Sequence, residues 1–273
     1  VRNAFKWTLL HNGLTAWACY GVVGISLAYM SYKKGLPLSV RSVLQPLFGK
    51  YLSGGLGHTI DIVAILATIV GLSVTIGYGV SQFASGLFNI TQFDWLVGEN
   101  SQPTIGAQLL GLLLIIGASC LSAMSGLHKG IKWLSNINMI LSLVLILFFM
   151  LFGASVFAFK TFFITIYDYL LALPEMSFTV WNSNDSEIIG KLQSWQSSWT
   201  IFYWAWWIAF APFVGIFLAR VSKGRTIREY VFGAIIVPSL ICLVWFAFIG
   251  GTAIDLELSG EAQGSIINTD ISN

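Results

Sequence analysis

Charged residues are scarce in this sequence. They make up 10% of the 273 residues, whereas hydrophobic residues make up 56% and the mean hydropathy is +0.78. An ordinary soluble domain carries roughly 25% charged residues, so this composition argues against a soluble globular protein. The chain is therefore predicted to be an integral membrane protein.

Residues that bind metals or act as nucleophiles are also few. The cysteines are isolated within apolar runs and form no C-x-x-C pair, which argues against a disulfide framework or a metal site: Cys19, Cys120 and Cys242. The histidines lie at the ends of apolar runs without a ligand partner at suitable spacing: His11, His58 and His128. Gly77-Tyr78-Gly79 lacks the next glycine of a dinucleotide loop. The sequence thus predicts no enzyme, no catalytic residue, no metal and no cofactor.

Long apolar runs, by contrast, are abundant. A membrane-spanning helix needs about 20 apolar residues, and these runs do not alternate as barrel strands would. We expect one all-α transmembrane domain, residues 1–273, with spans at 14–32, 60–87, 105–124, 133–157, 198–219 and 231–251. Two further segments, 38–50 and 162–176, are predicted to be surface helices.

Basic and acidic residues are segregated between alternate loops. Basic residues follow the first, third and fifth spans: Lys33, Lys34, Arg41, Lys50, Lys129, Lys132, Arg220, Lys223, Arg225 and Arg228. The other loops carry acidic residues: Asp94, Glu99, Asp168, Glu175, Asp185, Glu187, Asp255, Glu257, Glu261 and Asp270. The positive-inside rule assigns the basic loops to the cytoplasm, where they would meet anionic lipid rather than nucleic acid. The first span then enters from outside, so a cytoplasmic natural N-terminus would require an odd number of spans before Val1.

Aromatic residues are concentrated in the fifth span. Six of them follow one another at steps of three or four and form one helical stripe: Trp199, Tyr203, Trp206, Phe210, Phe213 and Phe217. A stripe of aromatic faces without a charged partner suits a quaternary ammonium, which has no N–H to donate and is held by ring quadrupoles. The alternative is an interfacial belt, which occupies only a turn or two at each end of a span and to which we assign Trp195 and Trp245.

Polar groups within the other spans offer further candidates. Trp17 and Tyr20 share one face of the first span. Asp61 is the only acid within any expected span, at its cytoplasmic end, where His58 or a loop arginine would pair with it in a capping or gating role. The hydroxyl of Thr68 either coordinates a cation or bonds back to its own helix, and the sequence alone favours the second.

These residues resemble the betaine/choline/carnitine transporter family. The run from Trp199 to Ile208 (WTIFYWAWWI), with APFVG from 211 and ARVSKGRTIRE from 219, is similar to its eighth span and following loop. Trp17-x-x-Tyr20 resembles its fourth span, and Gly57-His-x-Ile-Asp61 the start of its fifth. The resemblance covers nearly all of the chain as spans four to nine of twelve, which implies three spans before Val1 and part of a leucine-transporter-type inverted-repeat bundle.

The resemblance implies a function and assigns roles. It implies an ion-coupled symporter that imports a quaternary ammonium osmolyte or precursor such as glycine betaine or choline, as a homotrimer in a bacterial inner membrane. The implied substrate box is formed by Trp17, Tyr20, Trp206, Trp207 and Phe210, with Phe213 and Phe217 along the cytoplasmic pathway. The implied coupling-ion site is Thr68 with the backbone around Phe213.

Two departures from the family pattern bear on these roles. Many relatives have His-Trp-Gly where this chain has His11-Asn12-Gly13, so one wall of the box is altered. Sodium-coupled relatives pair two threonines one turn apart, whereas Thr68 is followed by Leu72, which leaves sodium and proton coupling both open. Two other classes of protein remain as alternatives: a membrane enzyme or quinone-binding subunit with an aromatic-lined cleft, and a channel.

Overall fold

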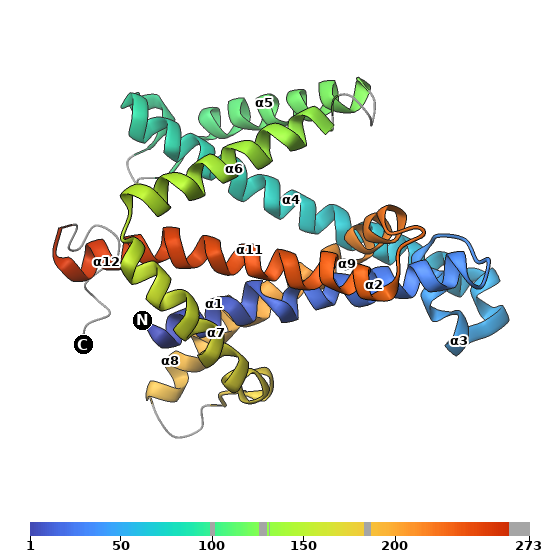
Figure 1. Cartoon of the computed structure of the whole chain (residues 1–273). Coiled ribbons are helices and arrows are strands. Elements are labelled where there is room, and N and C mark those ends of the chain that lie inside the picture. The colour runs from blue at the N-terminus through green and yellow to red at the C-terminus, as the bar shows by residue number, and fades with distance from the viewer. Residues whose placement is uncertain (99–101, 126–129, 131, 183–186, 262–273) are drawn as a thin grey trace. The chain divides into compact units, whose positions relative to one another are not determined.

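The computed structural model describes residues 1–98, 102–125, 130, 132–182 and 187–261 (Figure 1). Five residues used in the charge and histidine patterns above lie outside the described residues: Glu99, His128, Lys129, Asp185 and Asp270. All regular secondary structure in the described part is helical, apart from one isolated bridge between Val97 and Pro103.

The first half of the chain contains three long helical segments and a set of short helices. Its helices are α1 (Arg2–Asn12), α2 (Leu14–Tyr32), η1 (Val40–Leu44), α3 (Gln45–Phe48), η2 (Gly49–Ser53), α4 (Gly55–Thr91), η3 (Asp94–Leu96) and α5 (Ile105–Met124). The predicted surface helix at 38–50 is thus three short helices.

The second half is helical over most of its described length. Its helices are α6 (Lys132–Phe152), α7 (Ser155–Phe178), α8 (Glu187–Gln196), η5 (Ser197–Ile201), α9 (Phe202–Val221), α10 (Ile227–Val231), η6 (Phe232–Ile236), α11 (Val237–Trp245), η7 (Phe246–Gly250) and α12 (Gly251–Ser259). The elements η5, η6 and η7 are π-helical turns inside longer helices.

Seven helical segments of the described chain are long and apolar enough to cross a membrane. Five of them contain a predicted span and a sixth, Lys132–Phe152, contains most of one; the six are Arg2–Tyr32, Gly55–Thr91, Ile105–Met124, Lys132–Phe152, Glu187–Val221 and Ile227–Ser259. The prediction of an all-α membrane protein is therefore confirmed. The single-domain assignment and the inverted-repeat arrangement stay predictions.

The seventh segment, Ser155–Phe178, contains the predicted surface helix at 162–176. By length and composition it too could cross a membrane. The predicted span 133–157 was wrong at its C-terminal end, because α6 ends at Phe152 and α7 begins at Ser155. The break is fixed by Thr252, whose hydroxyl accepts from the backbone N–H of Ala154 at 3.2 Å. An apolar run continues across this break, which is why hydropathy does not reveal it.

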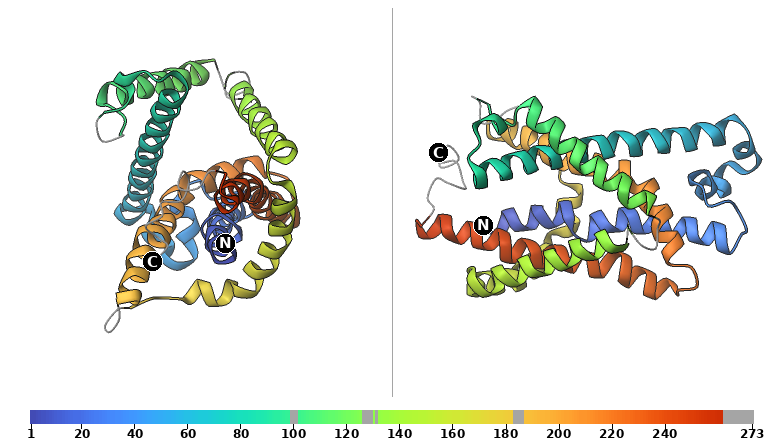
Figure 2. Two further views of the ribbon diagram at one scale, coloured as in Figure 1. Left: turned by 90° about the vertical axis from the view of Figure 1, so that its left-hand side faces the viewer. Right: turned by 90° about the horizontal axis from the view of Figure 1, so that it is seen from above.

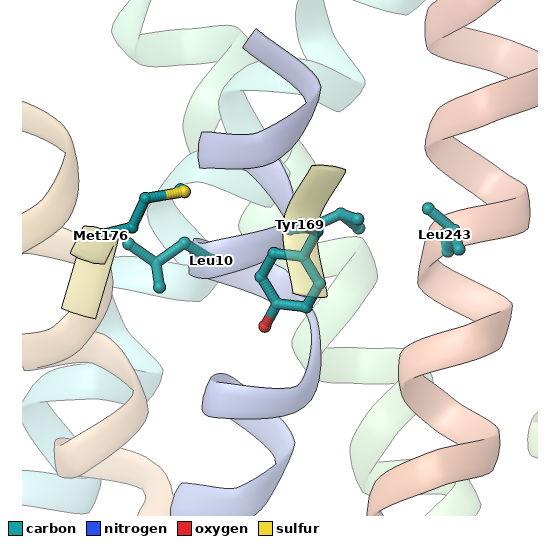
Figure 3. Close-up of a cluster of buried hydrophobic side chains, with 5 residues drawn as sticks. Leu10, Tyr169, Met176 and Leu243 are labelled. Atoms are coloured by element: carbon teal, nitrogen blue, oxygen red, sulfur yellow. The ribbon is translucent and has the colours of Figure 1, made fainter. Parts of the chain in front are cut away.

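The described contacts divide the chain into two compact units. The first contains residues 1–68 and 145–273, and within it α2 packs along α9 and also contacts α11 (Figure 2). One core of this unit joins Leu9 and Leu10 of α1 to Tyr169 and Met176 of α7 and to Leu243 of α11 (Figure 3). This core holds α1 in place beside α7.

The second unit contains residues 69–144. Its core is formed by Ala84 of α4, Leu96 of η3 and Ala107 of α5. A Cβ atom on Gly111 of α5 would lie 3.3 Å from the Val80 side chain of α4, so a glycine allows these two helices to approach closely.

Candidate functional site

The candidate site is positioned by a close crossing of α2 and α9. A Cβ atom on Gly24 would lie 3.2 Å from the carbonyl oxygen of Gly215, and one on Gly215 would lie 3.2 Å from the backbone nitrogen of Gly24. Ala211, Gly215 and Ala219 form a buried row of small residues on the face of α9 that packs on α2. Small residues at such spacing let two helix backbones approach within a membrane, where packing and hydrogen bonds drive association.

Two tyrosine hydroxyls reinforce this crossing. Tyr230 of α10 donates to the carbonyl of Gly21 at 2.9 Å, and Tyr32 of α2 donates to the carbonyl of Ala219 at 3.1 Å. Each bond satisfies a polar group that would be costly to bury alone. The first bond joins α10 to α2, and the second joins α2 to α9.

Three predicted site residues come together on this frame. The ring centroids of Trp17 and Tyr20 lie 6.0 Å apart, those of Trp17 and Trp207 5.8 Å, and those of Tyr20 and Trp207 4.8 Å. We call Trp17, Tyr20 and Trp207 the aromatic triad. Tyr20 is buried, and the indole nitrogen of Trp17 is buried without a hydrogen-bond partner among the residues described.

The remaining aromatic residues of α9 lie on other faces. Trp206 contacts Phe202 at 5.4 Å and stacks on Phe210 at 6.4 Å. Phe213 and Phe217, the predicted pathway residues, are 59% and 57% exposed. Consecutive residues of a helix point about 100° apart, so Trp206 and Trp207 serve different faces. Whether Trp206 and Phe210 contact substrate stays a prediction.

His11 also contacts the candidate site, and the motif His11-Asn12-Gly13 was its sequence signal. Its ring is buried, its Nε2 lies 2.9 Å from the Thr200 hydroxyl, and it stacks on Tyr203 at 5.1 Å. Its backbone carbonyl accepts a hydrogen bond from the indole nitrogen of Trp207 at 2.7 Å. His11 therefore fixes the position of a triad ring through its backbone.

The interruption of the helix at Gly13 makes the backbone carbonyl of His11 accessible. Helix α1 ends at Asn12 and α2 begins at Leu14, so carbonyls at the end of α1 lose their helical donors. The carbonyl of Leu10 accepts from the Thr15 hydroxyl at 2.6 Å, and that of His11 accepts from Trp207. A glycine after Asn12 inside an otherwise continuous pattern is the sequence signal that indicates this break.

A second aromatic cluster lies next to His11. The ring centroid of Trp7 lies 5.3 Å from those of both Trp181 and Trp195, and Trp195 lies 6.0 Å from the His11 ring. Rings at these distances contact one another directly, so the cluster packs α8 against α1. Trp195 has this packing role in the described structure, in addition to any belt position.

The predicted pairing of Asp61 is confirmed. Its carboxylate accepts from the Arg41 side-chain Nε at 2.5 Å and from the Arg41 backbone nitrogen at 3.1 Å. Arg41 also contacts His58 Nδ1 at 3.0 Å and donates to the carbonyl of Leu52 at 3.4 Å. One arginine thus ties the short helices to the start of α4.

Thr68 uses its hydroxyl within its own helix. Thr68 Oγ1 donates to the carbonyl of Ala64 at 2.8 Å, as the sequence alone favoured. This bond leaves the oxygen lone pairs available, so the geometry is compatible with cation coordination but is not evidence for it. No group of three or more metal-ligating side chains occurs among the described residues.

Comparison with known proteins shows the family of the chain. The model of the BCCT family, the betaine/carnitine/choline family transporters, matches residues 1–272. The chain belongs to this family. It is 40% identical over 269 residues to the glycine betaine transporter OpuD of Bacillus subtilis, covering 98% of this chain and 50% of that protein.

Two choline transporters are similarly related. The high-affinity choline transport protein of Escherichia coli is 39% identical over 262 residues, which are 96% of this chain and 37% of that protein. An osmo-dependent choline transporter of Acinetobacter baylyi is 39% identical over 254 residues, 93% of this chain and 35% of that protein. The chain thus spans half or less of the length of these relatives. As a BCCT family member it is a multi-pass membrane protein of a transporter family.

Proposed function

We propose that the protein containing this BCCT chain imports a quaternary ammonium compound, such as glycine betaine or choline, by ion-coupled secondary transport. The observation that carries the proposal is the aromatic triad, which brings Trp17 and Tyr20 of α2 within 6 Å of Trp207 of α9. The chain's relatives include a glycine betaine transporter and a choline transporter, which supports the same substrate class.

The chemistry of the substrate explains why rings are used. A trimethylammonium group has no N–H, so a carboxylate could attract it but could not fix its orientation by hydrogen bonds. Aromatic faces within about 6 Å of the cation attract it through their quadrupoles, and tryptophan does so most strongly. Indole and phenol rings also replace the water that a weakly hydrated cation loses.

The triad is closed in this conformation. Its rings contact one another, and the centroids of Tyr20 and Trp207 lie only 4.8 Å apart. A cation therefore binds only when the rings separate or when it meets their outer faces. Substrate that stabilises one arrangement of α2 and α9 over another shifts the population of the two states, which is what alternating access requires.

Several finer properties complete the proposal. Thr68 and the backbone around Phe213 would hold a coupling sodium ion, with proton coupling as the other possibility. The protein would act as a homotrimer in a bacterial inner membrane, in contact with membrane lipids. The family match and the bacterial relatives support the membrane location.

Uptake by the full-length protein tests the substrate class. In proteoliposomes we expect saturable uptake of glycine betaine or choline, and little uptake of glycine, which lacks the methyl groups. Trp207→Ala removes one desolvated cation–π contact of about 2 kcal/mol and should weaken the apparent affinity roughly 30-fold. Trp133→Ala removes a 68% exposed indole of α6 and serves as the matched control. Equal affinities in the wild type and Trp207→Ala would contradict the proposal.

A further inference from the structure

A groove lies at the end of the helix pair, away from the triad. It has a cavity volume of about 730 Å³ and runs between the C-terminal end of α2 and the connection from α9 to α10. Its polar lining includes Tyr29, Tyr32, Lys33, Lys223 and Arg225. The two sides of this groove are almost 200 residues apart in the sequence, so only the packing of α2 on α9 brings them together.

The groove carries an excess of positive charge. Lys33, Lys34 and Lys223 form no ion pair within the described residues. Arg225 faces Glu229 at 4.0 Å, the outer limit of an ion pair. The other carboxylate oxygen of Glu229 accepts from the Thr226 backbone nitrogen at 2.8 Å. One partly engaged carboxylate thus opposes three cations that line the groove, with Lys34 next to Lys33 in the sequence.

Two of these cations are held over tyrosine rings. The Lys223 ammonium lies 5.7 Å from the ring centroid of Tyr32, and the Lys34 ammonium lies 5.9 Å from that of Tyr29. The Tyr32 hydroxyl is itself fixed by its bond to the carbonyl of Ala219. Cation–π contact reduces the freedom of the lysine side chains, so the ammonium groups are positioned before an anion binds.

The groove changes from cationic to apolar along the helices. Ala28 and Ile25, one and two turns before Tyr32 on α2, line it together with Ile227. An adjoining cavity of about 340 Å³ shares Ser222, Arg225 and Tyr230 with it, and continues along Leu218, Val221 and Ala234. A small soluble anion would contact only the cationic end of the groove, whereas a lipid would contact both the cationic end and the apolar part.

We propose that this groove binds an anionic phospholipid, with the phosphodiester headgroup at Lys33, Lys223 and Arg225 and an acyl chain along the apolar part. The lysines act as point charges toward the phosphate, and Arg225 supplies a planar donor pair. The position of the cations at the end of α2, a segment long enough to span a membrane, places them at headgroup depth. This binding site is separate from the triad, so the inference does not rest on the proposed transport function.

Native mass spectrometry of the full-length protein tests the proposal. Dioleoyl phosphatidylglycerol would be titrated against dioleoyl phosphatidylcholine, which has the same chains and a zwitterionic headgroup. Each lysine near an anionic lipid contributes about fivefold in affinity, so Lys33→Gln with Lys223→Gln should weaken phosphatidylglycerol binding about 30-fold. Binding of phosphatidylcholine should change little.

The matched control removes the same charge outside the groove. Lys50→Gln with Arg228→Gln replaces two exposed cations that do not line the cavity. If this control loses as much affinity, the effect is general surface charge and the proposal is wrong. Glycerophosphoglycerol, the headgroup without chains, separates the sources: displacement of the lipid by equimolar headgroup would indicate a soluble-anion site. Wild-type phosphatidylglycerol affinity in the groove variant would contradict the proposal.

Discussion

The indole nitrogen of Trp207 donates to the backbone carbonyl of His11 across 2.7 Å. This bond joins the end of α1 to α9, and it determines which way one ring of the triad faces. The Trp207 ring therefore has two roles that can be separated: its face is available to a cation, and its edge is attached to the break at Gly13.

Trp207→Phe separates these two roles. The variant keeps an aromatic face but removes the donor, so the His11 carbonyl loses its bond. Leaving a buried acceptor unpaired costs about 1–3 kcal/mol, so we expect a lower unfolding temperature and weaker substrate affinity in the full-length protein. Trp204→Phe is the control, because the indole of Trp204 makes no hydrogen bond in the described structure. Equal thermal stability of the two variants would show that the His11 bond contributes nothing.

Gly215→Ala tests the helix crossing that carries the triad. The added Cβ would lie 2.6 Å from Val23 Cγ1 and 3.2 Å from the backbone nitrogen of Gly24, so α2 and α9 must move apart. Overpacking of this kind typically costs about 1–3 kcal/mol.

The readouts are thermal unfolding and uptake affinity, and Gly77→Ala is the matched control. Gly77 also lies within a helix, but its added Cβ would meet no atom within 4 Å. We expect the control to be neutral or slightly stabilising, because alanine favours helix more than glycine does. A Gly215→Ala variant as stable as Gly77→Ala would contradict the close crossing.

Hydropathy predicted most of the helices but not their breaks. Helix α5 has the predicted bounds at Ile105 and Met124, because a polar turn precedes it and a polar segment follows it. The breaks at Gly13 and Gly153 lie inside or beside apolar runs, and tertiary partners stabilise them: Trp207 at the first and Thr252 at the second. The glycine marks where the helix can break, but the local sequence does not show which distant residue stabilises that break.

The pattern of small residues could have distinguished Trp207 from Trp206. Ala211, Gly215 and Ala219 repeat at four-residue steps and are the residues of α9 buried against α2. Extending this row back by one step reaches Trp207, which is the tryptophan that meets Trp17 and Tyr20. The aromatic stripe alone pointed to Trp206, because a pattern of large residues does not show which face packs on another helix.

Thr68→Ala tests the coupling-ion proposal against a matched threonine of the same helix. Thr68 bonds back to the carbonyl of Ala64 at 2.8 Å, and Thr75 bonds back to that of Gly71 at 3.0 Å. Because both bonds are local, both alanine variants should fold with nearly wild-type stability. Uptake by the full-length protein would be measured under a sodium gradient, a proton gradient or neither. If Thr68 helps to hold sodium, its variant loses the sodium dependence of uptake and Thr75→Ala keeps it.

With Leu72 in place of a second threonine, the sodium dependence of the wild type should itself be weak, since one hydroxyl and a backbone carbonyl supply few oxygens to a hard cation. Strong sodium dependence that survives Thr68→Ala would place the coupling site elsewhere.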